Sequence, residues 1–255
     1  MTAEQKQQRL LDWLRGQGKV AVAFSGGVDS AYLLWAAAES GADAVAYYVS
    51  TAFQPAFEGA DARRLCAELG VALRTVAVDV LSCPDVTENG PRRCYFCKKR
   101  LFTAMQAAAA ADGCTVLCDG TNASDDAADR PGMAALEELS VASPLREAGL
   151  TKAEIRELSR AAGLFTWDKP AYACLATRIP TGTAITAADL QRTERAEGYL
   201  MSLGFRDFRV RLFGGGARIQ LQETQFPLFL QHREAIVATL RQWYGAVLLD
   251  GEVRP

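Results

Sequence analysis

The chain has 255 residues and a formal net charge of −2, with 49% hydrophobic and 23% charged residues. This composition is typical of a globular protein, and the length suits one α/β domain with a smaller appended domain. No apolar run approaches the length of a bilayer span, so we expect no membrane segment. The near-neutral charge gives no overall attraction to a phosphate backbone, which argues against nucleic acid as a partner.

The first half of the chain alternates short β-branched runs with alanine-rich helical stretches. This alternation predicts a parallel sheet with crossover helices. In the N-terminal segment that precedes it, charges interrupt the apolar positions, so we expect no export signal. A protein without an export signal is expected in the cytoplasm, with its cysteines reduced. The predicted strands are 19–24, 43–50, 71–78 and 114–120, with helices from about 29, up to about 69 and from about 97.

The second half begins with a helix that Thr151 and Glu154 open as a capping box and Gly163 closes. A loop follows over 167–186, and we place a domain boundary near Ile185. Beyond it we expect a helix over about 186–203, a hairpin from 206–213 and 217–222, another helix and a strand at 246–250. The predicted architecture is a parallel-sheet α/β domain, residues 1–185, and a small α+β domain, residues 186–255.

A glycine-rich turn, SGGVDS, follows the first predicted strand. Gly26 and Gly27 let successive backbone N–H groups converge on an anion, and the Ser25 and Ser30 hydroxyls and the helix N-terminus add to that attraction. Asp29 is placed to hold Mg²⁺ against phosphate. The motif differs from a Walker A loop and from GxGxxG. The turn therefore predicts a phosphate site, the alternative being a structural turn in which Asp29 caps the helix.

Polar residues also follow the other predicted strands. Ser50 ends the second strand, and the segment DGTN, with Gly120 in it, ends the fourth. Ligands of parallel sheets bind at the carboxyl ends of the strands, so we expect Ser50 and Gly120 at the nucleotide site. Asp125 and Asp129 are further candidates for assisting Mg²⁺, with loop salt bridges as the alternative.

The SGGVDS segment resembles the signature SGGxDS of the PP-loop superfamily, the adenine nucleotide alpha-hydrolases. The resemblance implies a Rossmann-like domain that cleaves ATP to AMP and pyrophosphate and activates a carbonyl or carboxyl oxygen as an adenylate. The nucleophile that displaces AMP is left open by this motif.

The cysteines bear on that nucleophile. Cys94 and Cys97 lie two residues apart at the entry to a predicted helix, and Cys174 lies in the loop segment ACLATR. Three thiolates suit an iron–sulfur cluster with one open iron, whereas structural zinc needs a fourth ligand, for which Cys83 is a candidate. The alternative interpretation is that these cysteines are unrelated. Three others, Cys66, Cys114 and Cys118, are expected in the core, with 114 and 118 on the same strand face.

A combination of motifs is more specific than SGGVDS alone. PRRCYFCK, DGTNASD, RPG at 130–132, SPL at 143–145 and ACLATRI together resemble the LarE family of ATP-dependent sacrificial sulfur transferases, from about residue 18 onward. The resemblance implies that the carboxylates of pyridinium-3,5-biscarboxylic acid mononucleotide, a small nucleotide substrate of nickel-pincer nucleotide biosynthesis, are adenylated and converted to thiocarboxylates.

The family resemblance also assigns roles to the cysteines. Some members sacrifice one cysteine and become dehydroalanine, whereas others hold a 4Fe–4S cluster on three cysteines and pass on an extra sulfide. Cys174 matches the sacrificial position, and the presence of Cys94 and Cys97 resembles the cluster-bearing type. The implied cofactors are ATP, Mg²⁺ and the cluster, and the implied assembly is a homo-oligomer such as a hexamer.

In the second domain, period-two alternation places Arg209 and Arg211 on one face of a predicted strand. A solvated sheet face is the plain alternative, and the family resemblance implies that both arginines bind the substrate phosphate. Glu197 matches a carboxylate of the family's metal or phosphate site. Gln220 replaces the acidic residue that usually follows Ala-Arg-Ile, which argues against a second metal there. Arg178, four residues after Cys174, is expected to face the adenylate.

Three other functions remain open from sequence. A tRNA thiolation enzyme would share adenylation and cysteine chemistry, and the basic and aromatic residues of 92–100 suit such a role. An amidating ligase like NAD synthetase would share adenylation without needing the three cysteines. A nucleotide-sensing module would bind ATP without releasing pyrophosphate.

Overall fold

The computed structural model describes residues 1–125 and 130–254, and the chain divides into two compact units. The first unit comprises Met1–Thr51, Ala56–Asp79 and Cys94–Lys169, and the second comprises Ala52–Pro55, Val80–Arg93 and the chain from Pro170 onward. Compared with the predicted boundary near Ile185, the second unit begins earlier. The reason is local packing: the 3₁₀ helix η2 (Leu175–Arg178) contacts α9 (Ala187–Ser202) and β5 (Arg209–Phe213).

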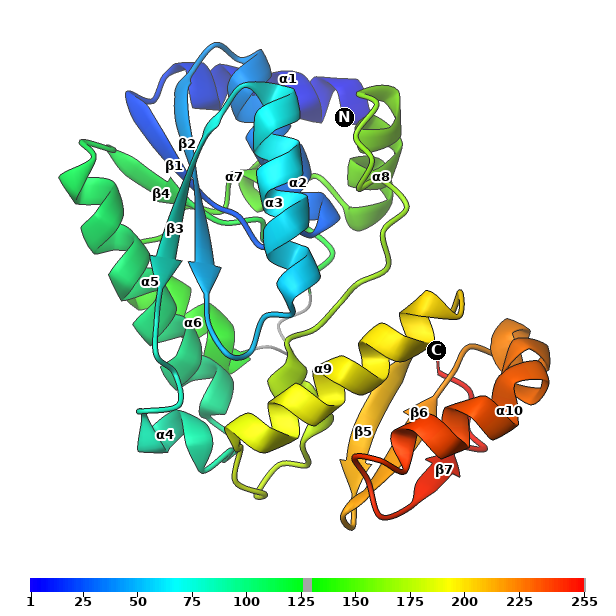
Figure 1. Ribbon diagram of the computed structural model, residues 1–255. Helices are drawn as coiled ribbons and strands as arrows, with labels where there is room; N and C mark the ends of the chain where they lie inside the picture. The colour runs from blue at the N-terminus through cyan, green and yellow to red at the C-terminus, as the bar shows by residue number, and fades with distance from the viewer. Residues whose placement is uncertain (126–129, 255) are drawn as a thin grey trace. The chain divides into compact units, whose positions relative to one another are not determined.

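The first unit contains a four-stranded parallel sheet, as the alternating sequence pattern predicts, and its strand order is β3-β2-β1-β4 (Figure 1). Short, mostly buried strands alternate with helices, so each crossover helix can cover a sheet face. The elements are α1 (Ala3–Arg15), β1 (Lys19–Ala23), α2 (Val28–Glu39), β2 (Asp43–Ser50), α3 (Ala56–Leu69), β3 (Ala72–Ala77), α5 (Arg93–Ala111), β4 (Val116–Cys118), α6 (Arg130–Glu138), α7 (Pro144–Glu147) and α8 (Lys152–Ala161).

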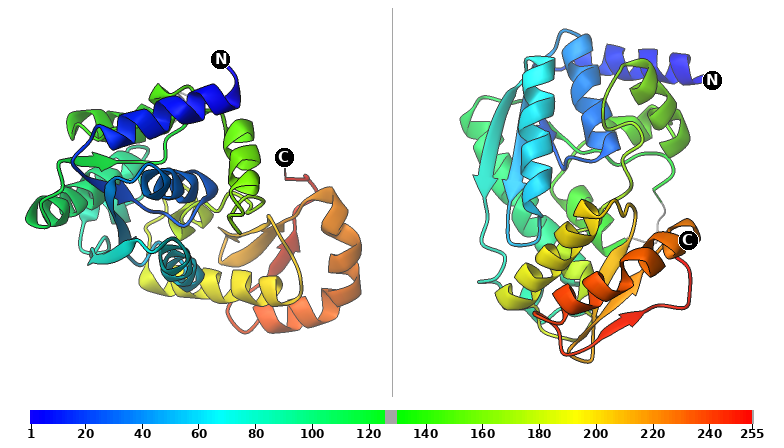
Figure 2. Two further views of the ribbon diagram at one scale, coloured as in Figure 1. Left: turned by 90° about the horizontal axis from the view of Figure 1, so that it is seen from above. Right: turned by 45° about the vertical axis from the view of Figure 1, so that its right-hand side comes forward.

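Two apolar layers sandwich this sheet. One face carries Val20 and Val22 of β1 and is packed by residues of α1, α2, α3, α7 and α8. The other face carries Ala21 and Ala23 and is packed by α5, which lies across the sheet from α1 and α2 in the views of Figure 2. Strand β1 contributes buried residues to both layers, so the turn that follows it leaves a strand packed on both faces.

The predicted core cysteines do not share one face. Cys66 and Cys118 are buried in the first apolar layer, and burial raises the pKa of both thiols, which keeps them protonated. Cys114 packs against the opposite layer. The expectation that 114 and 118 share a strand face is wrong, because β4 begins only at Val116 and the Cys114 N–H instead bonds the Ala109 carbonyl in the preceding turn.

The second unit contains a three-stranded sheet in the order β5-β6-β7, in which β5 and β6 form an antiparallel hairpin and β6 and β7 are parallel. Figures 1 and 2 show α9 and α10 against the same face of this sheet. Within the described ranges, no helix is long and apolar enough to cross a bilayer. The remaining elements are α4 (Pro84–Thr87), β6 (Gly216–Gln220), η3 (Glu223–Gln225), α10 (Phe226–Leu240) and β7 (Val247–Leu249).

Candidate functional site

The SGGVDS turn lies between the buried end of β1 and the start of α2. Gly26 has φ of +76°, a conformation that residues with a side chain rarely adopt, and Gly27 is the N-cap of α2 without any side-chain cap. The Ser30 hydroxyl accepts the Ser25 N–H at 3.2 Å and donates to the Gly27 carbonyl at 3.2 Å. The turn therefore closes on itself and leaves the helix N-terminus without a side-chain cap, an arrangement that suits an anion.

Gly120, predicted at the nucleotide site, lies directly beside this turn. A Cβ atom at Gly120 would come within 2.9 Å of the Ser30 nitrogen and 3.3 Å of its Cα. Both atoms are backbone and cannot swing away, so only glycine fits. The close approach places the end of β4 against the first turn of α2, as the predicted convergence of strand ends requires.

Asp29 lies in the first turn of α2 with both carboxylate oxygens engaged. Oδ1 accepts a hydrogen bond from the Asn122 amide at 3.3 Å, and Oδ2 forms an ion pair with the Lys152 ammonium. Burial raises the pKa of Asp29, and Lys152 opposes that rise. Asp29 therefore does not act as the cap of α2, and its charge is balanced by a lysine that the sequence motifs do not single out.

A second lysine reaches the same turn. Lys169 donates to the Gly26 carbonyl at 2.9 Å and forms an ion pair with Asp61 at 2.6 Å. Lys169 lies 143 positions from Gly26 in the chain. The spacing of residues in the sequence does not predict that either lysine reaches the turn, since both lie in parts of the chain that follow the strands of the sheet.

The other predicted nucleotide residues are placed near strand ends. Ser50 is exposed at the end of β2, and its carbonyl accepts the Val78 N–H at 3.0 Å. Asp125 accepts the Asn122 N–H at 2.7 Å, so it supports the loop that carries the amide partner of Asp29. Asp129 lies outside the described residues.

Cys94 and Cys97 lie in the first two turns of α5, which begins at Arg93, four residues earlier than predicted. Side chains three positions apart share one face of a helix, and both thiols are half-buried. The pair thus fits two ligand positions of one metal centre. Throughout the part of the chain that the structure describes, no three Cys, His, Asp or Glu side chains group as a metal site.

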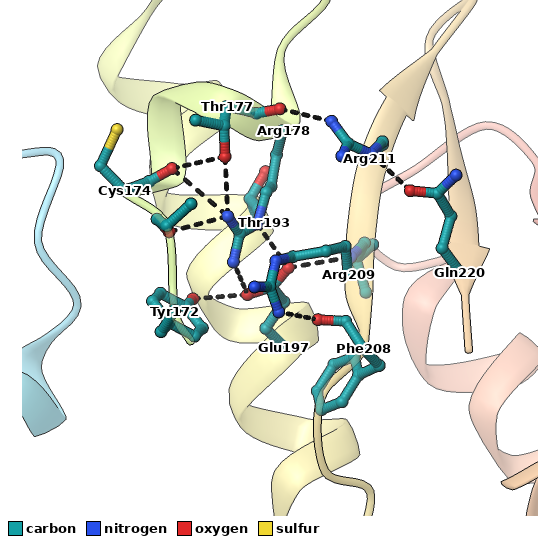
Figure 3. Close-up of polar contacts among 12 residues, drawn as sticks. Tyr172, Cys174, Thr177, Arg178, Thr193, Glu197, Phe208, Arg209, Arg211 and Gln220 are labelled. Carbon is teal, nitrogen blue, oxygen red and sulfur yellow. Dashed lines mark hydrogen bonds and ion pairs between the residues drawn. The ribbon is translucent and has the colours of Figure 1, made fainter. Parts of the chain in front are cut away.

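Cys174 directly precedes η2 in the second unit and is half-buried. Its carbonyl accepts hydrogen bonds from the Thr177 hydroxyl at 2.8 Å and from Arg178 Nη1 at 3.3 Å. Figure 3 shows the Cys174 sulfur pointing away from the Arg178 guanidinium while the carbonyl points toward it. The backbone of Cys174 is therefore fixed by polar contacts that do not use its thiol.

Two further residues hold the same segment, a role that sequence reasoning assigned to neither. Arg93 donates to the Ala176 carbonyl at 3.2 Å and to Asn89 Oδ1 at 2.7 Å. The buried Asn89 amide bonds the carbonyls of Pro180 at 2.9 Å and Thr183 at 3.0 Å. The segment predicted as an open loop is thus tied down by side chains rather than by regular secondary structure.

Arg178 and Glu197 form a buried two-bond ion pair. Nε and Nη2 of Arg178 bond the two Glu197 oxygens at 2.8 and 2.9 Å, and neither side chain exposes more than 1%. Burial acts to lower the pKa of Arg178, but its bonds with Glu197 outweigh that and raise it. Glu197 also accepts the Tyr172 hydroxyl and the Val210 N–H. These contacts favour an anchoring role over the adenylate and metal contacts expected of the two residues.

Arg209 and Arg211 lie on β5 with their guanidinium groups near that pair. Arg209 is only 5% exposed, so the solvated-face interpretation is wrong for it. Burial, together with repulsion from Arg178 and Arg254, lowers the pKa of Arg209 to about 10, and burial also lowers the pKa of Arg211. Both stay cationic at neutral pH. Mutually repelling cations gain from a bound anion, which suits a phosphate.

Gln220 connects this cluster to the C-terminal strand region. Its carbonyl oxygen accepts a hydrogen bond from Arg211 (Figure 3), and its amide donates to Asp250 at 2.8 Å. A neutral amide makes both bonds without adding negative charge beside Arg211.

Comparison with known proteins identifies relatives over most of the chain, although no family model matches. The chain is 38% identical over 232 residues to an uncharacterised protein of Synechocystis sp., covering 89% of this chain and 85% of the relative. It is 27% identical over 218 residues to an uncharacterised protein of Methanocaldococcus jannaschii, covering 86% and 83%.

A third relative has an assigned activity. The chain is 34% identical over 237 residues to the pyridinium-3,5-bisthiocarboxylic acid mononucleotide synthase of Lactiplantibacillus plantarum, covering 92% of this chain and 86% of that enzyme. Identity of this extent, together with the parallel sheet, shows that the chain belongs to the LarE family of sulfur transferases.

Proposed function

We propose that this enzyme adenylates the carboxylates of pyridinium-3,5-biscarboxylic acid mononucleotide and converts them to thiocarboxylates. The observation that carries the proposal is the 34% identity, over 92% of the chain, to an enzyme named for the bisthiocarboxylic product. The nucleotide turn and the Cys174 segment supply chemistry suited to the two halves of that reaction.

The first half activates the carboxylate. A carboxylate is a poor electrophile, so one of its oxygens attacks the α-phosphorus of ATP, pyrophosphate leaves, and a mixed anhydride with AMP remains. The N-terminus of α2 and the Ser25 hydroxyl suit the departing pyrophosphate, with Lys152 and Lys169 adding positive charge at the turn. Asp29 fits a single carboxylate ligand to Mg²⁺, which takes most of its other ligands from phosphate and water in nucleotide sites.

The second half transfers sulfur. A sulfur nucleophile attacks the acyl carbon, and AMP leaves with the anhydride oxygen. If the Cys174 thiolate attacks, a thioester forms, and cleavage of its Cβ–Sγ bond with loss of the Cα proton releases the thiocarboxylate and leaves dehydroalanine. A 4Fe–4S cluster on Cys94, Cys97 and Cys174 would instead supply a sulfide and spare the side chain. The shared helix face of Cys94 and Cys97 supports the second route.

The substrate phosphate is assigned to Arg209 and Arg211. Burial, mutual repulsion among neighbouring guanidinium groups and the neutral Gln220 all favour an anion beside these side chains. We place the enzyme in the cytoplasm as a homo-oligomer, because reduced thiols are needed for the sulfur step and the family resemblance implies subunit association.

The test incubates the anaerobically prepared enzyme with ATP, Mg²⁺ and pyridinium-3,5-biscarboxylic acid mononucleotide. We expect pyrophosphate, AMP and a product whose mass shows oxygen replaced by sulfur. Parallel reactions offer tRNA as acceptor and ammonia as nucleophile. Thiolated tRNA or an amide product, with no thiocarboxylate, would contradict the proposal, as would ATP binding without any pyrophosphate release.

The sulfur route is tested separately. Iron and acid-labile sulfide are measured after reconstitution, and the mass of the peptide containing Cys174 is measured after turnover. Bound iron with an unchanged peptide supports the cluster. Absence of iron together with conversion of Cys174 to dehydroalanine would replace the cluster by single-use donation.

A further inference from the structure

The segment that carries Cys174 is held through its backbone carbonyls by Arg93, at the Ala176 carbonyl, and by three further arginines. Arg178 Nη1 donates to the Ala173 carbonyl at 2.8 Å and to the Cys174 carbonyl at 3.3 Å. Arg211 Nη1 donates to the Thr177 carbonyl at 2.7 Å, and Arg209 donates to the Ala171 carbonyl. Of these three, only Arg178 contacts the carbonyl of Cys174 itself and the one just before it.

We infer that Arg178, anchored by Glu197, is a positioning residue that fixes the backbone of Cys174 for the sulfur-transfer step. The inference rests on the proposed function, in which Cys174 handles the transferred sulfur. It reassigns Arg178, which the sequence placed at the adenylate, to a role that acts through Cys174.

All three nitrogens of the Arg178 guanidinium are engaged by groups of the protein itself. Nε and Nη2 are committed to Glu197, and Nη1 is shared among the Ala173 and Cys174 carbonyls and the Thr177 hydroxyl at 2.8 Å. The side chain is fully buried. The planar guanidinium bonds the Glu197 carboxylate on one side and the backbone carbonyls of the Cys174 segment on the other. It therefore fixes the position of that backbone relative to Glu197, which a single ammonium group cannot do.

Glu197, in helix α9, fixes the position of the Arg178 guanidinium. Its side chain bonds Arg178, the Val210 N–H at 2.9 Å and the Tyr172 hydroxyl. Tyr172 lies two residues before Cys174, and the centroid of its ring lies 4.6 Å from the Arg178 guanidinium carbon. Glu197 therefore ties helix α9 and strand β5 to both sides of the bend at Cys174.

The thiol is directed away from these contacts, as Figure 3 shows. The backbone of Cys174 is fixed, and its sulfur points away from the groups that fix it. This arrangement is expected of a nucleophile or metal ligand that must point in a defined direction. Small displacements of a reacting atom lower rates steeply, so loss of this fixation should slow sulfur transfer more than adenylation.

The experiment compares the full-length wild type, Arg178→Lys and Arg192→Lys. Lysine keeps a positive charge beside Glu197 but cannot reach both carbonyls. Arg192 pairs with Asp189 on the same helix α9 and provides the matched control. Three quantities are measured for each: thiocarboxylate formed per AMP released, the rate of pyrophosphate release, and the rate of Cys174 alkylation relative to Cys94 and Cys97, read by peptide mass spectrometry.

For Arg178→Lys we expect thiocarboxylate per AMP to fall about tenfold or more, with pyrophosphate release within about twofold of wild type. The alkylation rate of Cys174 should change while those of Cys94 and Cys97 do not, and Arg192→Lys should match wild type throughout. Equal losses of sulfur transfer and pyrophosphate release in Arg178→Lys would indicate a merely structural role and overturn the inference.

The alkylation measurement separates this inference from the proposed function. If wild type forms no thiocarboxylate, the proposed function fails, and a selective change at Cys174 in Arg178→Lys still supports positioning. An unchanged Cys174 alkylation rate in that variant overturns the positioning role, whatever the enzyme's product.

Discussion

The Lys152 ammonium forms an ion pair with Asp29, although 123 positions separate the two residues in the chain. Lys152 is the first residue of α8, and the Thr151–Glu154 capping box fixes where that helix begins. The nucleotide turn therefore depends on a helix start that lies far from it in sequence. This dependence links the stability of α8 to the chemistry proposed at the turn.

Asp29→Asn should separate chemistry from stability. Burial disfavours the Asp29 charge, and Lys152 is about a third exposed and stays hydrated without its partner, so stability should change by no more than about 1 kcal/mol. Loss of the proposed Mg²⁺ ligand should lower pyrophosphate release about 100-fold. A urea unfolding curve and a pyrophosphate assay give the two values; near-normal release would exclude Asp29 from metal binding.

Glu154 should make stability depend on pH. Hydrogen bonds from Lys6 and from the Thr151 backbone lower its pKa from 4.5 to about 2. A carboxyl with a depressed pKa stabilises the fold above its unfolded value and loses that contribution as pH falls through the folded value. Glu154→Gln keeps an N3 capping group without the charge. The melting temperatures of the two proteins should differ most above pH 5 and converge toward pH 2; a constant difference would contradict this.

Gly120→Ala should damage nucleotide binding while leaving most of the fold. The added Cβ meets the Ser30 backbone at 2.9 Å, so α2 or β4 must shift at the turn. We expect ATP affinity, measured by calorimetry, to fall at least about tenfold. Gly251→Ala is the control, because nothing lies within 4 Å of its added Cβ. Equal ATP affinities in the two variants would show that the turn tolerates the shift.

Arg178→Met should strongly destabilise the enzyme. It leaves Glu197 buried without its cation, a change that typically costs about 3–5 kcal/mol. Adding Glu197→Gln should recover part of that loss, because the neutral amide can still accept the Val210 N–H. Urea unfolding followed by far-ultraviolet circular dichroism measures both. If Arg178→Met alone were as stable as wild type, Arg178 and Glu197 would not form the buried ion pair described here.

Local patterns predict the first sheet well, because each strand is a short apolar run with its own turn residues. The SGGVDS turn was also predictable, since its glycines and serines are contiguous. Lys152 and Lys169 were not, because nothing in the local sequence indicates that a lysine at the start of α8 or after its end reaches Asp29 or Gly26. Their contacts arise only when α8 packs against α2.

The structure of the Cys174 segment could not be predicted from its local sequence. It has almost no regular secondary structure, so composition predicts a loop, yet its carbonyls are held by Arg178, Arg209 and Arg211. The alternating pattern of the strand predicts that Arg209 lies on a polar face of the sheet. The pattern cannot predict that the segment beginning at Pro170 packs over that face and buries Arg209. Sequence therefore identified the arginines as anion-binding candidates and missed their bonds to the backbone.

The most direct test of sulfur transfer through Cys174 is a single-turnover reaction of Cys174→Ala beside wild type. Each protein receives ATP, Mg²⁺ and pyridinium-3,5-biscarboxylic acid mononucleotide, and AMP, pyrophosphate and thiocarboxylate are quantified together. We predict that Cys174→Ala still releases pyrophosphate, because the SGGVDS turn is intact, and forms no thiocarboxylate. Thiocarboxylate formed by Cys174→Ala at the wild-type yield would contradict the account.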